Sequence, residues 1–527
     1  MNLNTAIIVS LIYFGITIYL GWLGYSKTKN ASDYLVAGRK MHPFLMAMAY
    51  GSTFISTSAI VGFGGAAGMF GMGLLWLSFL NIIVGIYIAF AVFGKRTRTI
   101  GRILDAHTFP ELMGKRFKSK TIQCICGSII FLSMPLYSAA VMIGGARFLE
   151  QAFRMNYSFA LFIFAFVVVF YVFFGGLKGI MYTDAFQGSI MLLGMGALLF
   201  LTYNKLGGIL PAHQLLTSIA DKVPQKMMEM GHMGWTAMPK FSSEIWWVLV
   251  STIVLGVGIG VLAQPQLVVR YMTVSSAREL NRAIGIGGFF IFMMTTVAFV
   301  VGSLTNAYFF QTQGKISLQM VFDQAVGKPN IDKIIPLYIS TAMPEWFTYL
   351  FLLTLLAAGM STLSGQFHAI GTSIGRDVFQ QVFRKTSHEK HSIRITRAGI
   401  LIAFVITVIL GFKLPGSIIA IATAIFFGLC AVCFLPMYIG ALYIKSMTKV
   451  EAISSMFSGL IVWLFWILFI EIKKSSVLGV CQYISGKPSL MTGSVVSSID
   501  PIVVALPVSF AVMFIMLAIK KKKTSGA

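Results

Sequence analysis

Long apolar runs, separated by short polar or basic segments, divide the whole sequence. The first run, residues 5–25, is long enough to cross the roughly 30 Å hydrocarbon core of a bilayer as a helix rising about 1.5 Å per residue. No basic segment precedes it and no small-residue cleavage site follows it, so we expect a retained span. The runs indicate about 13 spans, beginning near residues 5, 43, 75, 122, 157, 181, 244, 283, 343, 397, 417, 451 and 501. This pattern predicts an all-α polytopic membrane protein.

The composition excludes a soluble globular fold. Hydrophobic residues make up 57% of the chain and charged residues only 11%, against roughly a quarter in soluble domains. The net charge of +24 does not indicate nucleic-acid binding, because the basic residues are scattered between apolar runs. The five cysteines lack the neighbouring His or Cys that would complete a metal site. We therefore expect the lipid bilayer as a partner, and neither nucleic acid nor a cofactor.

The basic residues predict the orientation in the membrane. An odd number of spans puts the two termini on opposite sides. With the N-terminus outside, the strongest basic clusters fall inside, as the positive-inside rule requires; these are residues 95–98, 115–118, 376–397 and 520–523. We expect a protein of the plasma (inner) membrane with a cytoplasmic C-terminus.

Two spans contain residues that favour a broken helix. The second holds a glycine-rich stretch at 62–68, and the seventh holds glycines at 256–260 followed by Gln264-Pro265. Broken backbone at membrane depth is tolerated only where it lines a protein-enclosed cavity. The alternative is that such glycines simply permit close helix packing.

The positions of these spans predict an internal repeat. Each opens a group of five spans, and because five is odd the second group enters the membrane from the opposite side, as in an inverted repeat. We expect one transporter domain over 1–527, with an extra first helix and loop at 1–42, a first repeat at 43–204, a second repeat at 244–443, and two C-terminal helices with a basic tail at 450–527.

The ninth span carries adjacent hydroxyls, Ser361 and Thr362, among the small residues of 356–364. Sodium takes several oxygen ligands, and neutral hydroxyls and carbonyls provide them without preventing release. The remaining oxygens would be carbonyls freed where the second span breaks. The alternative is that each hydroxyl bonds back to its own helix.

Four motifs in the same order identify the chain as similar to the sodium:solute symporter family. They are 359–364 with Arg376-Asp377, 175–178 with Thr183-Asp184, Gln264-Pro265 with Arg270, and 144–147. The resemblance covers essentially the whole chain. It implies a transporter rather than an enzyme, with the five-plus-five inverted-repeat fold also found in amino-acid transporters, one helix before the repeats and two after.

The resemblance also implies an ion site. It puts the common sodium ion at the backbone carbonyls of Ser52, Ile55 and Ala358 and the hydroxyls of Ser361 and Thr362.

Asp184 matches an acidic position on the ion's inward route. The alternative for this carboxylate is a solvated pairing with the nearby Lys178. We expect Arg147 and Arg270 to anchor helix ends, and His368 to satisfy its ring within the bundle.

The solute is predicted less directly. Phe54 and Val257 stand where proline carriers of the family have an Asp and an aromatic residue, and Ala59 stands where sugar carriers have a Gln. The stretches 53–59 and 143–147 most resemble pantothenate and monocarboxylate carriers, so we expect an organic anion. A half-helix N-terminus favours a carboxylate. The expected pocket residues are Thr57, Ser58, Ala59, Tyr137, Ser138, Val261 and Gln264.

We therefore expect a symporter that uses the sodium gradient to import a small organic solute by alternating access. A sodium-coupled amino acid or sugar symporter, and a proton-coupled or uncoupled carrier on the same fold, stay open as alternatives. A channel needs a continuous polar pore, and a membrane-embedded enzyme needs paired carboxylates, a His cluster or an activated nucleophile. The sequence shows none of these, and it leaves the oligomeric state and the sodium stoichiometry open.

Overall fold

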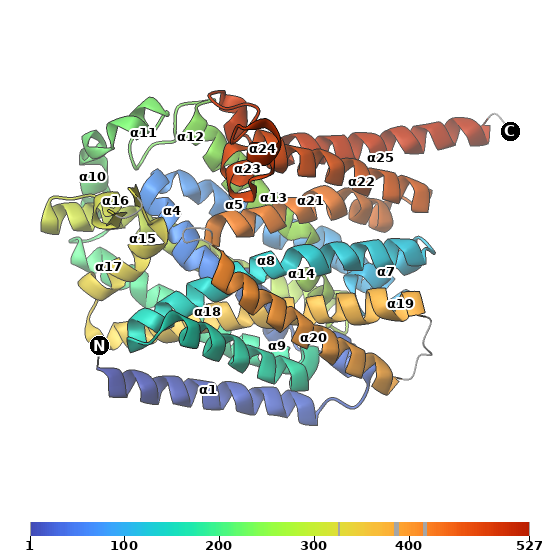
Figure 1. The fold of residues 1–527 in the computed structure, drawn as a ribbon. Coiled ribbons are helices and arrows are strands. Elements are labelled where there is room, and N and C mark those ends of the chain that lie inside the picture. The colour runs from blue at the N-terminus through green and yellow to red at the C-terminus, as the bar shows by residue number, and fades with distance from the viewer. Residues whose placement is uncertain (1, 325–326, 384–388, 415–418, 526–527) are drawn as a thin grey trace.

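The computed structural model describes residues 2–324, 327–383, 389–414 and 419–525. Residues 384–388 of the predicted basic loop, and residues 1 and 526–527 of the predicted terminal segments, lie outside this described part. Within it the chain forms a helical bundle, with one short antiparallel pairing of β1 (Phe322–Asp323) and β2 (Lys328–Pro329). Figure 1 shows that α1 (Leu3–Ser26) begins at one end of the bundle and α25 (Ile502–Ser525) ends at the other.

The elements preceding the long loops form the first half of the bundle. After α1 come α2 (Ala31–Val36), η1 (Ala37–Arg39), α3 (Pro43–Phe54), η2 (Ser58–Gly62), α4 (Phe63–Phe70), η3 (Gly71–Leu74), α5 (Leu75–Ile82), η4 (Ile83–Gly94), α6 (Lys95–Ile103), α7 (Phe109–Arg116), α8 (Lys120–Phe153) and α9 (Tyr157–Lys205).

The second half follows a set of short helices at one end of the bundle. These are α10 (Ile209–Ser218), η5 (Ala220–Lys222) and α11 (Gln225–Glu229). Then come α12 (Glu244–Trp247), η6 (Val248–Leu255), α13 (Gly256–Gly260), η7 (Val261–Ala263), α14 (Pro265–Tyr271), α15 (Ala277–Gln313), α16 (Ser317–Met320), η8 (Ile331–Lys333), α17 (Ile334–Ala342), α18 (Glu345–Thr372), η9 (Ser373–Phe379), α19 (Gln380–Phe383), α20 (Glu389–Lys413) and α21 (Ile419–Tyr443).

The C-terminal extension packs against this bundle. It consists of α22 (Lys449–Phe465), η10 (Trp466–Ile470), α23 (Ile472–Leu478), α24 (Val480–Ser485), η11 (Val495–Ser498) and α25.

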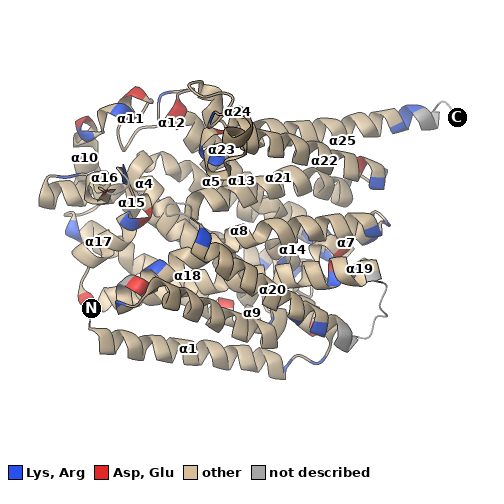
Figure 2. Ribbon diagram, viewed as in Figure 1, with Lys and Arg blue, Asp and Glu red and all other residues tan. Residues whose placement is uncertain are grey.

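Polar side chains cap the long helices where they begin. Ser119 accepts a hydrogen bond from the backbone N–H of Ile122 at the start of α8, and Ser276 and Glu279 form a capping box at the start of α15. Such caps satisfy N–H groups that have no partner within the helix. Figure 2 shows that charged residues gather toward the two ends of the bundle, while long stretches of helix between them carry none. This arrangement suits helices whose middle parts meet lipid or one another.

Eleven helices in the described part are long and apolar enough to cross a membrane. Two of these segments hold more than one predicted span. Ser58–Ile103 contains the second half of the second span and the whole third span, and α9 contains the fifth and the sixth. The all-α polytopic prediction is therefore confirmed, and the count of about 13 spans stays a prediction.

A single glycine folds α9 back on itself. Gly176 has φ 56° and ψ −161°, a conformation that side chains disfavour. Before it, the Tyr171 hydroxyl donates to the Met360 carbonyl at 3.0 Å; after it, Asp184 accepts from the Ser364 hydroxyl at 3.0 Å. Both partners lie on α18 about one turn apart. The two arms of α9 therefore reach the same depth and run in opposite directions.

The second and seventh spans are both broken, as predicted. In the second, α3 ends at Phe54, Ile55 is extended (φ −87°, ψ 100°), and η2 resumes at Ser58. In the seventh, Gln264 is extended (φ −72°, ψ 120°) and Pro265 opens α14, where a missing N–H costs nothing.

The glycine-rich stretch 62–68 does not form the break, and here the close-packing alternative is correct. The stretch stays helical, and a Cβ at Gly65 would lie 2.1 Å from the carbonyl oxygen of Ile331. Glycine is required because the loop before α17 passes directly over this face. The break itself lies two turns earlier, at 55–57.

Helix α18 forms the centre of the bundle. Every residue from 354 to 372 is buried, so all faces of this part contact protein. By contrast, Leu11, Phe162 and Val405 on α1, α9 and α20 are exposed apolar side chains on the outside. A helix buried on all sides carries its hydroxyls into the interior, where each needs a partner.

Candidate functional site

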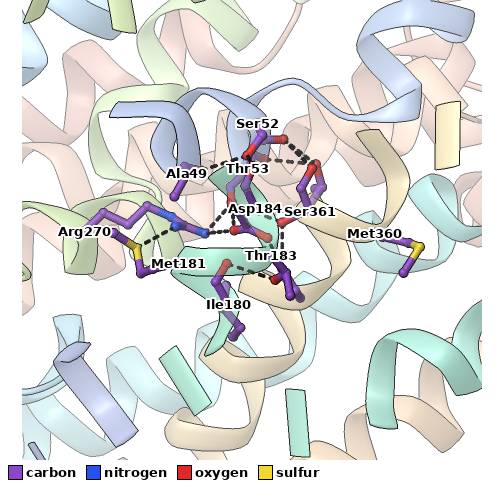
Figure 3. Close-up of polar contacts among 12 residues, drawn as sticks. Ala49, Ser52, Thr53, Ile180, Met181, Thr183, Asp184, Arg270, Met360 and Ser361 are labelled. Atoms are coloured by element: carbon purple, nitrogen blue, oxygen red, sulfur yellow. Dashed lines mark hydrogen bonds and ion pairs between the residues drawn. The ribbon is translucent and has the colours of Figure 1, made fainter. Parts of the chain in front are cut away.

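The hydroxyls of Ser361 and Thr362 face the end of α3. The Ser361 Oγ lies 2.8 Å from the carbonyl oxygen of Ser52, and the Thr362 Oγ1 lies 3.0 Å from that of Thr53 and 3.5 Å from that of Ser52. The last carbonyls of a helix have no partner within it. The break in the second span therefore frees the oxygens that the two hydroxyls of α18 meet. Figure 3 shows Ser361 facing Ser52 and Thr53.

The predicted sodium ligands are largely brought together. The Ala358 carbonyl lies 3.3 Å from the Ser361 Oγ, and Ile55 lies at the break itself, lining the adjoining cavity. The Ser361 hydroxyl is also 2.7 Å from the carbonyl of Ala357 in its own helix, which is the bond that the alternative interpretation expects. The geometry therefore contains both arrangements, and the sodium site stays a prediction.

A buried ion pair lies next to these hydroxyls. Asp184, on the second arm of α9, and Arg270, on α14, both have completely buried side chains, and the Asp184 Oδ2 is 2.7 Å from the Arg270 Nη2. Asp184 also accepts hydrogen bonds of 3.0 Å from the hydroxyls of Thr53 and Ser364. Removing charges from water is costly unless they are paired and hydrogen-bonded, and both conditions hold here.

The alternative interpretation of Asp184 as a solvated partner of Lys178 is wrong. The Lys178 Nζ pairs instead with the Asp33 Oδ1, at 2.8 Å. The kink at Gly176 explains the difference, because it turns the second arm of α9 so that Asp184 enters the core. Arg270 does more than anchor a helix end, since it neutralises this carboxylate and contacts the Met181 sulfur at 3.2 Å.

Thr53 joins the ion pair to the hydroxyl pair. Its hydroxyl contacts Asp184, Arg270 and, at 3.1 Å, the carbonyl of Ser361, while its own carbonyl accepts from Thr362. Thr53 is not among the residues predicted for this site. Its position beside Ser52, in the same last turn of α3, is the signal that would have found it.

A small cavity of about 20 Å³ adjoins the break in the second span. Of the predicted pocket residues, Ala59 and Tyr137 line it, and the Tyr137 ring stacks on Phe426 with centroids 5.5 Å apart. The other lining residues are mostly apolar: Phe54, Ile55, Ser56, Phe63, Leu77, Asn81, Val257, Thr295, Phe299, Thr423 and Phe427. The Asn81 Oδ1 is buried and has no hydrogen-bond partner among the described residues.

Three other predicted pocket residues make contacts within the bundle. The Thr57 hydroxyl donates to the Val141 carbonyl at 2.8 Å, and the Ser138 hydroxyl bonds to Met134 in its own helix at 3.1 Å. Val261 is buried on η7, close to the third span.

Two predicted pocket residues keep unused hydrogen-bonding groups. Ser58 begins η2, and its hydroxyl has no partner among the described residues. Gln264, at the second break, accepts from the Gln266 amide at 2.6 Å, while its own amide nitrogen is unpartnered in the described part.

The comparisons with known proteins now bear on this geometry. The model of the sodium:solute symporter family matches residues 34–459. The chain belongs to this family.

Similar proteins in the family are transporters. The osmoregulated proline transporter OpuE of Bacillus subtilis is 28% identical over 503 residues, covering 94% of this chain and 95% of that protein. The sodium/proline symporter of Staphylococcus aureus is 27% identical over 486 residues, covering 89% and 87%. Sodium-coupled solute symport is therefore the activity class of this chain, which is an integral membrane protein.

A solved structure supports the fold. A sodium-coupled sialic acid symporter, in a substrate-bound outward-open state, aligns with a TM-score of 0.72 at 16% identity, covering 97% of this chain and 95% of that one. The predicted fold class is confirmed. The repeat boundaries, 43–204 and 244–443, stay a prediction.

In this symporter, a large cavity lies on one side of the predicted sites. It has a volume of about 740 Å³ and reaches from Arg147 and Lys333 down to Val61 and Gly144. Gly144 lies against Thr57, so the cavity approaches the break in the second span. Arg147 pairs with Glu150 at 2.9 Å near the end of α8, as expected for an anchor.

On the other side, a cavity of about 20 Å³ lies beyond the ion pair. Gly365 and His368 line it, one and two turns after Ser361 on α18. The His368 Nε2 lies 3.2 Å from the Tyr34 carbonyl, so its ring is satisfied within the bundle as predicted.

An ion pair of Arg376 and Glu111, at 3.0 Å, closes this end of the bundle. Burial favours a higher pKa for Glu111, but a hydrogen bond from His107 and the charge of Arg376 outweigh it, and the pKa lies well below its usual range. Glu111 therefore stays ionised and paired at neutral pH. Arg376 also contacts His107, which lines the cavity of Gly365 and His368, so the ion pair lies next to that cavity.

Proposed function

We propose that this symporter imports a small organic anion, such as pantothenate or a monocarboxylate, with sodium by alternating access. The observation that carries the proposal is the meeting of the Ser361 and Thr362 hydroxyls with carbonyls at the broken second span, beside a small cavity. The proposed sodium ligands are the carbonyls of Ser52, Ile55 and Ala358 and these two hydroxyls. All five are neutral oxygens, which suits an ion that must be released on every cycle.

The anion is proposed to bind at the start of the outer half of the second span. The N-terminus of η2, which continues directly into α4, carries partial positive charge and lies beside the cavity. The Ser58 hydroxyl, which has no partner within the described residues, adds a donor at this N-terminus. The charge of the nearby sodium would compensate the carboxylate, while the apolar walls formed by Phe54 and Val257 would accept the rest of the solute.

Asp184 is proposed to lie on the ion's inward route. It stands beside the hydroxyl pair, and the cavity of Gly365 and His368 begins beyond it. In this structure Arg270 already neutralises Asp184. A sodium ion at Asp184 would therefore compete with the guanidinium, so inward passage requires Arg270 and Asp184 to separate.

The energetics distinguish anions from neutral solutes. At about 100 mV one entering charge gains roughly 2.3 kcal/mol, and a tenfold sodium gradient adds about 1.4 kcal/mol. One sodium would concentrate a neutral solute roughly 500-fold, but a monovalent anion only about tenfold, because the potential term cancels. A carrier that concentrates an anion strongly therefore needs a second sodium ion.

Proline is the second candidate solute, favoured by the names and near full-length coverage of the two bacterial relatives. Two residues argue against it. Phe54 and Val257 both line the cavity, so it has no carboxylate where the family's proline carriers have an Asp and only an aliphatic side chain where they have an aromatic residue. Asn81, whose Oδ1 is unpartnered within the described residues, is the polar group available to an amino acid.

Uptake into proteoliposomes tests both solutes. Radiolabelled pantothenate, lactate and L-proline are offered with external sodium or choline, with and without a pH gradient. We expect accumulation of pantothenate or lactate that needs sodium and not the pH gradient. Accumulation of proline alone would show that the solute is the amino acid and not an organic anion. Uptake driven by the pH gradient in choline would overturn sodium coupling.

The orientation is proposed from the basic clusters: N-terminus outside, C-terminus cytoplasmic, in the plasma (inner) membrane. Residues of α16 and α17 line the wide cavity, and Figure 1 shows both helices at the end of the bundle where α1 begins, so the cavity would face outward. Labelling of single cysteines introduced at Lys333 and at Lys118 in intact cells tests this. We expect an impermeant maleimide to label position 333 only, and labelling of position 118 alone would reverse the orientation.

A further inference from the structure

A buried ion cluster lies in the C-terminal extension, beyond residue 459, where the match to the family model ends. The Lys474 Nζ lies 2.6 Å from the Glu471 Oε2 and 2.5 Å from the Asp500 Oδ2. Their side chains are at most 5% exposed. Two carboxylates thus share one ammonium group away from water, an arrangement that persists only where its geometry is fixed.

A helix break and a helix start bring the three residues of this cluster together. The helix of the twelfth span ends at Ile470, Glu471 is extended (φ −73°, ψ 112°), and α23 begins at the next residue. This break puts Glu471 and Lys474 one turn apart and pointing to the same side. Asp500 comes directly before Pro501 and accepts from the Ile502 N–H at 3.0 Å, so it caps the start of α25.

Asp500 also contacts the broken seventh span. Its backbone N–H donates to the Ser251 Oγ at 2.9 Å, and Ser251 lies on η6, in the half of that span before the break. Figure 1 shows α23 and α24 beside α12 and α13, which flank η6. One residue therefore joins α23, α25 and the seventh span.

Asp500 also lies close to residues that line the solute cavity. Val257 is on the helix that carries Ser251, about two turns further on, and it lines the cavity. The Asp500 Oδ1 lies 3.8 Å from where a Gly428 side chain would begin, and the neighbouring Phe427 lines the same cavity. Asp500 thus stands behind two walls of the cavity without lining it.

We propose that Asp500, held in place by Lys474, is a positioning residue for transport: through Ser251 it fixes the outer half of the seventh span and so sets how Val257 meets the solute. The extension is then part of the solute-binding apparatus. The inference rests on the proposed function, because it requires solute binding at the cavity that Val257 lines.

A matched pair of variants tests the tie between Asp500 and the seventh span. Ser251→Thr and Ser251→Val have the same shape and differ only in the hydroxyl. The probe is whichever of pantothenate, lactate and L-proline the wild type accumulates. We expect Ser251→Val to raise the solute KM about fivefold over Ser251→Thr, with equal sodium half-saturation in both. The Val variant loses the bond from the Asp500 N–H and also the bond that the hydroxyl donates to the Trp247 carbonyl within its own helix.

The outcomes separate this inference from the proposed function. If the wild type accumulates none of the three solutes, the proposed function fails. If it does transport but the Thr and Val variants have equal KM, or differ only in the amount of folded protein, the inference is overturned. Ser458→Ala is the control, because the Ser458 hydroxyl bonds only within its own helix, at 3.0 Å to Ser455.

A second variant tests the holding role of Lys474. Asp500→Asn keeps the backbone N–H but removes the charge that Lys474 contacts. We expect a raised solute KM at unchanged sodium half-saturation. Lys474→Met leaves Glu471 and Asp500 without their shared counter-charge, and we expect it to raise the solute KM at least as much. A Lys474→Met variant with the wild-type solute KM, at a normal amount of folded protein, would contradict the role of Lys474.

Discussion

The ion region and the solute region lie side by side but differ in chemistry. Around Ser361 and Thr362, the two hydroxyls meet carbonyls of α3, and Asp184 and Arg270 neutralise each other, while the Arg270 Nε has no partner among the described residues. The adjoining cavity is mostly walled by apolar side chains, and its Asn81 Oδ1 lacks a partner among the described residues. The hydroxyls and the carboxylate of the first region are hydrogen-bonded within the protein, whereas the second region is a mostly apolar wall with one unpartnered amide oxygen.

This difference indicates that sodium binding and solute recognition depend on different residues. A pre-organised polar cluster fixes which ion binds and how tightly, because misplaced dipoles are costly in a low dielectric. An apolar cavity selects mainly by size and shape, where single changes have small effects. Variants in the ion region should therefore change sodium dependence, and variants in the cavity should change solute recognition.

The largest effect is expected at the central ion pair. Asp184→Asn leaves the Arg270 guanidinium buried without a counter-charge, which costs about 3–5 kcal/mol and should lower sodium-driven uptake by roughly 100-fold or more. The measurement is initial uptake in proteoliposomes, normalised to reconstituted protein.

The control for this variant is Lys178→Met, which breaks the partly exposed pair with Asp33. We expect it to keep uptake within about threefold of the wild type, because its side chains are 15% and 13% exposed and, unlike the central pair, are in contact with water. Equal losses in the two variants would show that the central pair has no special role.

The next effect is expected at the hydroxyl pair. Ser361→Ala and Thr362→Ala should each raise the sodium concentration for half-maximal uptake about tenfold, with solute KM at saturating sodium unchanged. Ser189→Ala is the control, because that hydroxyl bonds only to Ala185 in its own helix, at 2.9 Å. Unchanged sodium dependence in both variants, at normal protein amounts, would remove these residues from the ion site.

A smaller effect, on the solute KM instead of the sodium dependence, is expected in the cavity. Ala59→Val adds two methyl groups to a wall of a space of only about 20 Å³. We expect the solute KM to rise about fivefold and the sodium half-saturation to stay constant, since the residue faces the solute and not the ion. Ala59→Ser is the smaller control. A shift in sodium dependence alone would contradict the division between the two regions.

The smallest effect is expected at Ser138, a predicted pocket residue whose hydroxyl bonds within its own helix. Ser138→Ala should change solute KM and sodium half-saturation by less than about twofold, because the lost bond is local. Uptake titrations against both ligands measure this. A large rise in solute KM would show that Ser138 takes part in solute binding, and that the solute region extends beyond Tyr137.

The sequence predicted the parts of this protein that depend on local chemistry. Apolar runs predict the helices, Gln264-Pro265 marks the break in the seventh span, and the adjacent hydroxyls of α18 stand out among small residues. The break in the second span lacks such a mark. The glycines at 62–68 serve packing instead, so the glycine pattern located the span and missed the position of its break.

Long-range pairing could not be predicted in the same way. Asp184 and Arg270 are separated by 86 residues, and the sequence offered Lys178 as the nearer partner. The cavity wall likewise takes Asn81, Thr295 and Thr423 from three separate spans. Only the kink at Gly176 and the packing of the spans decide which of these side chains meet.

The contact at Gly65 has a practical consequence. The Ile331 carbonyl passes so close to this glycine that any side chain there would act as a wedge between the second span and the loop before α17. A substitution at residue 65 would separate the second span from Ile331 without contacting a proposed ion or solute ligand. It is therefore a rational site for trapping one conformer of the protein for direct imaging.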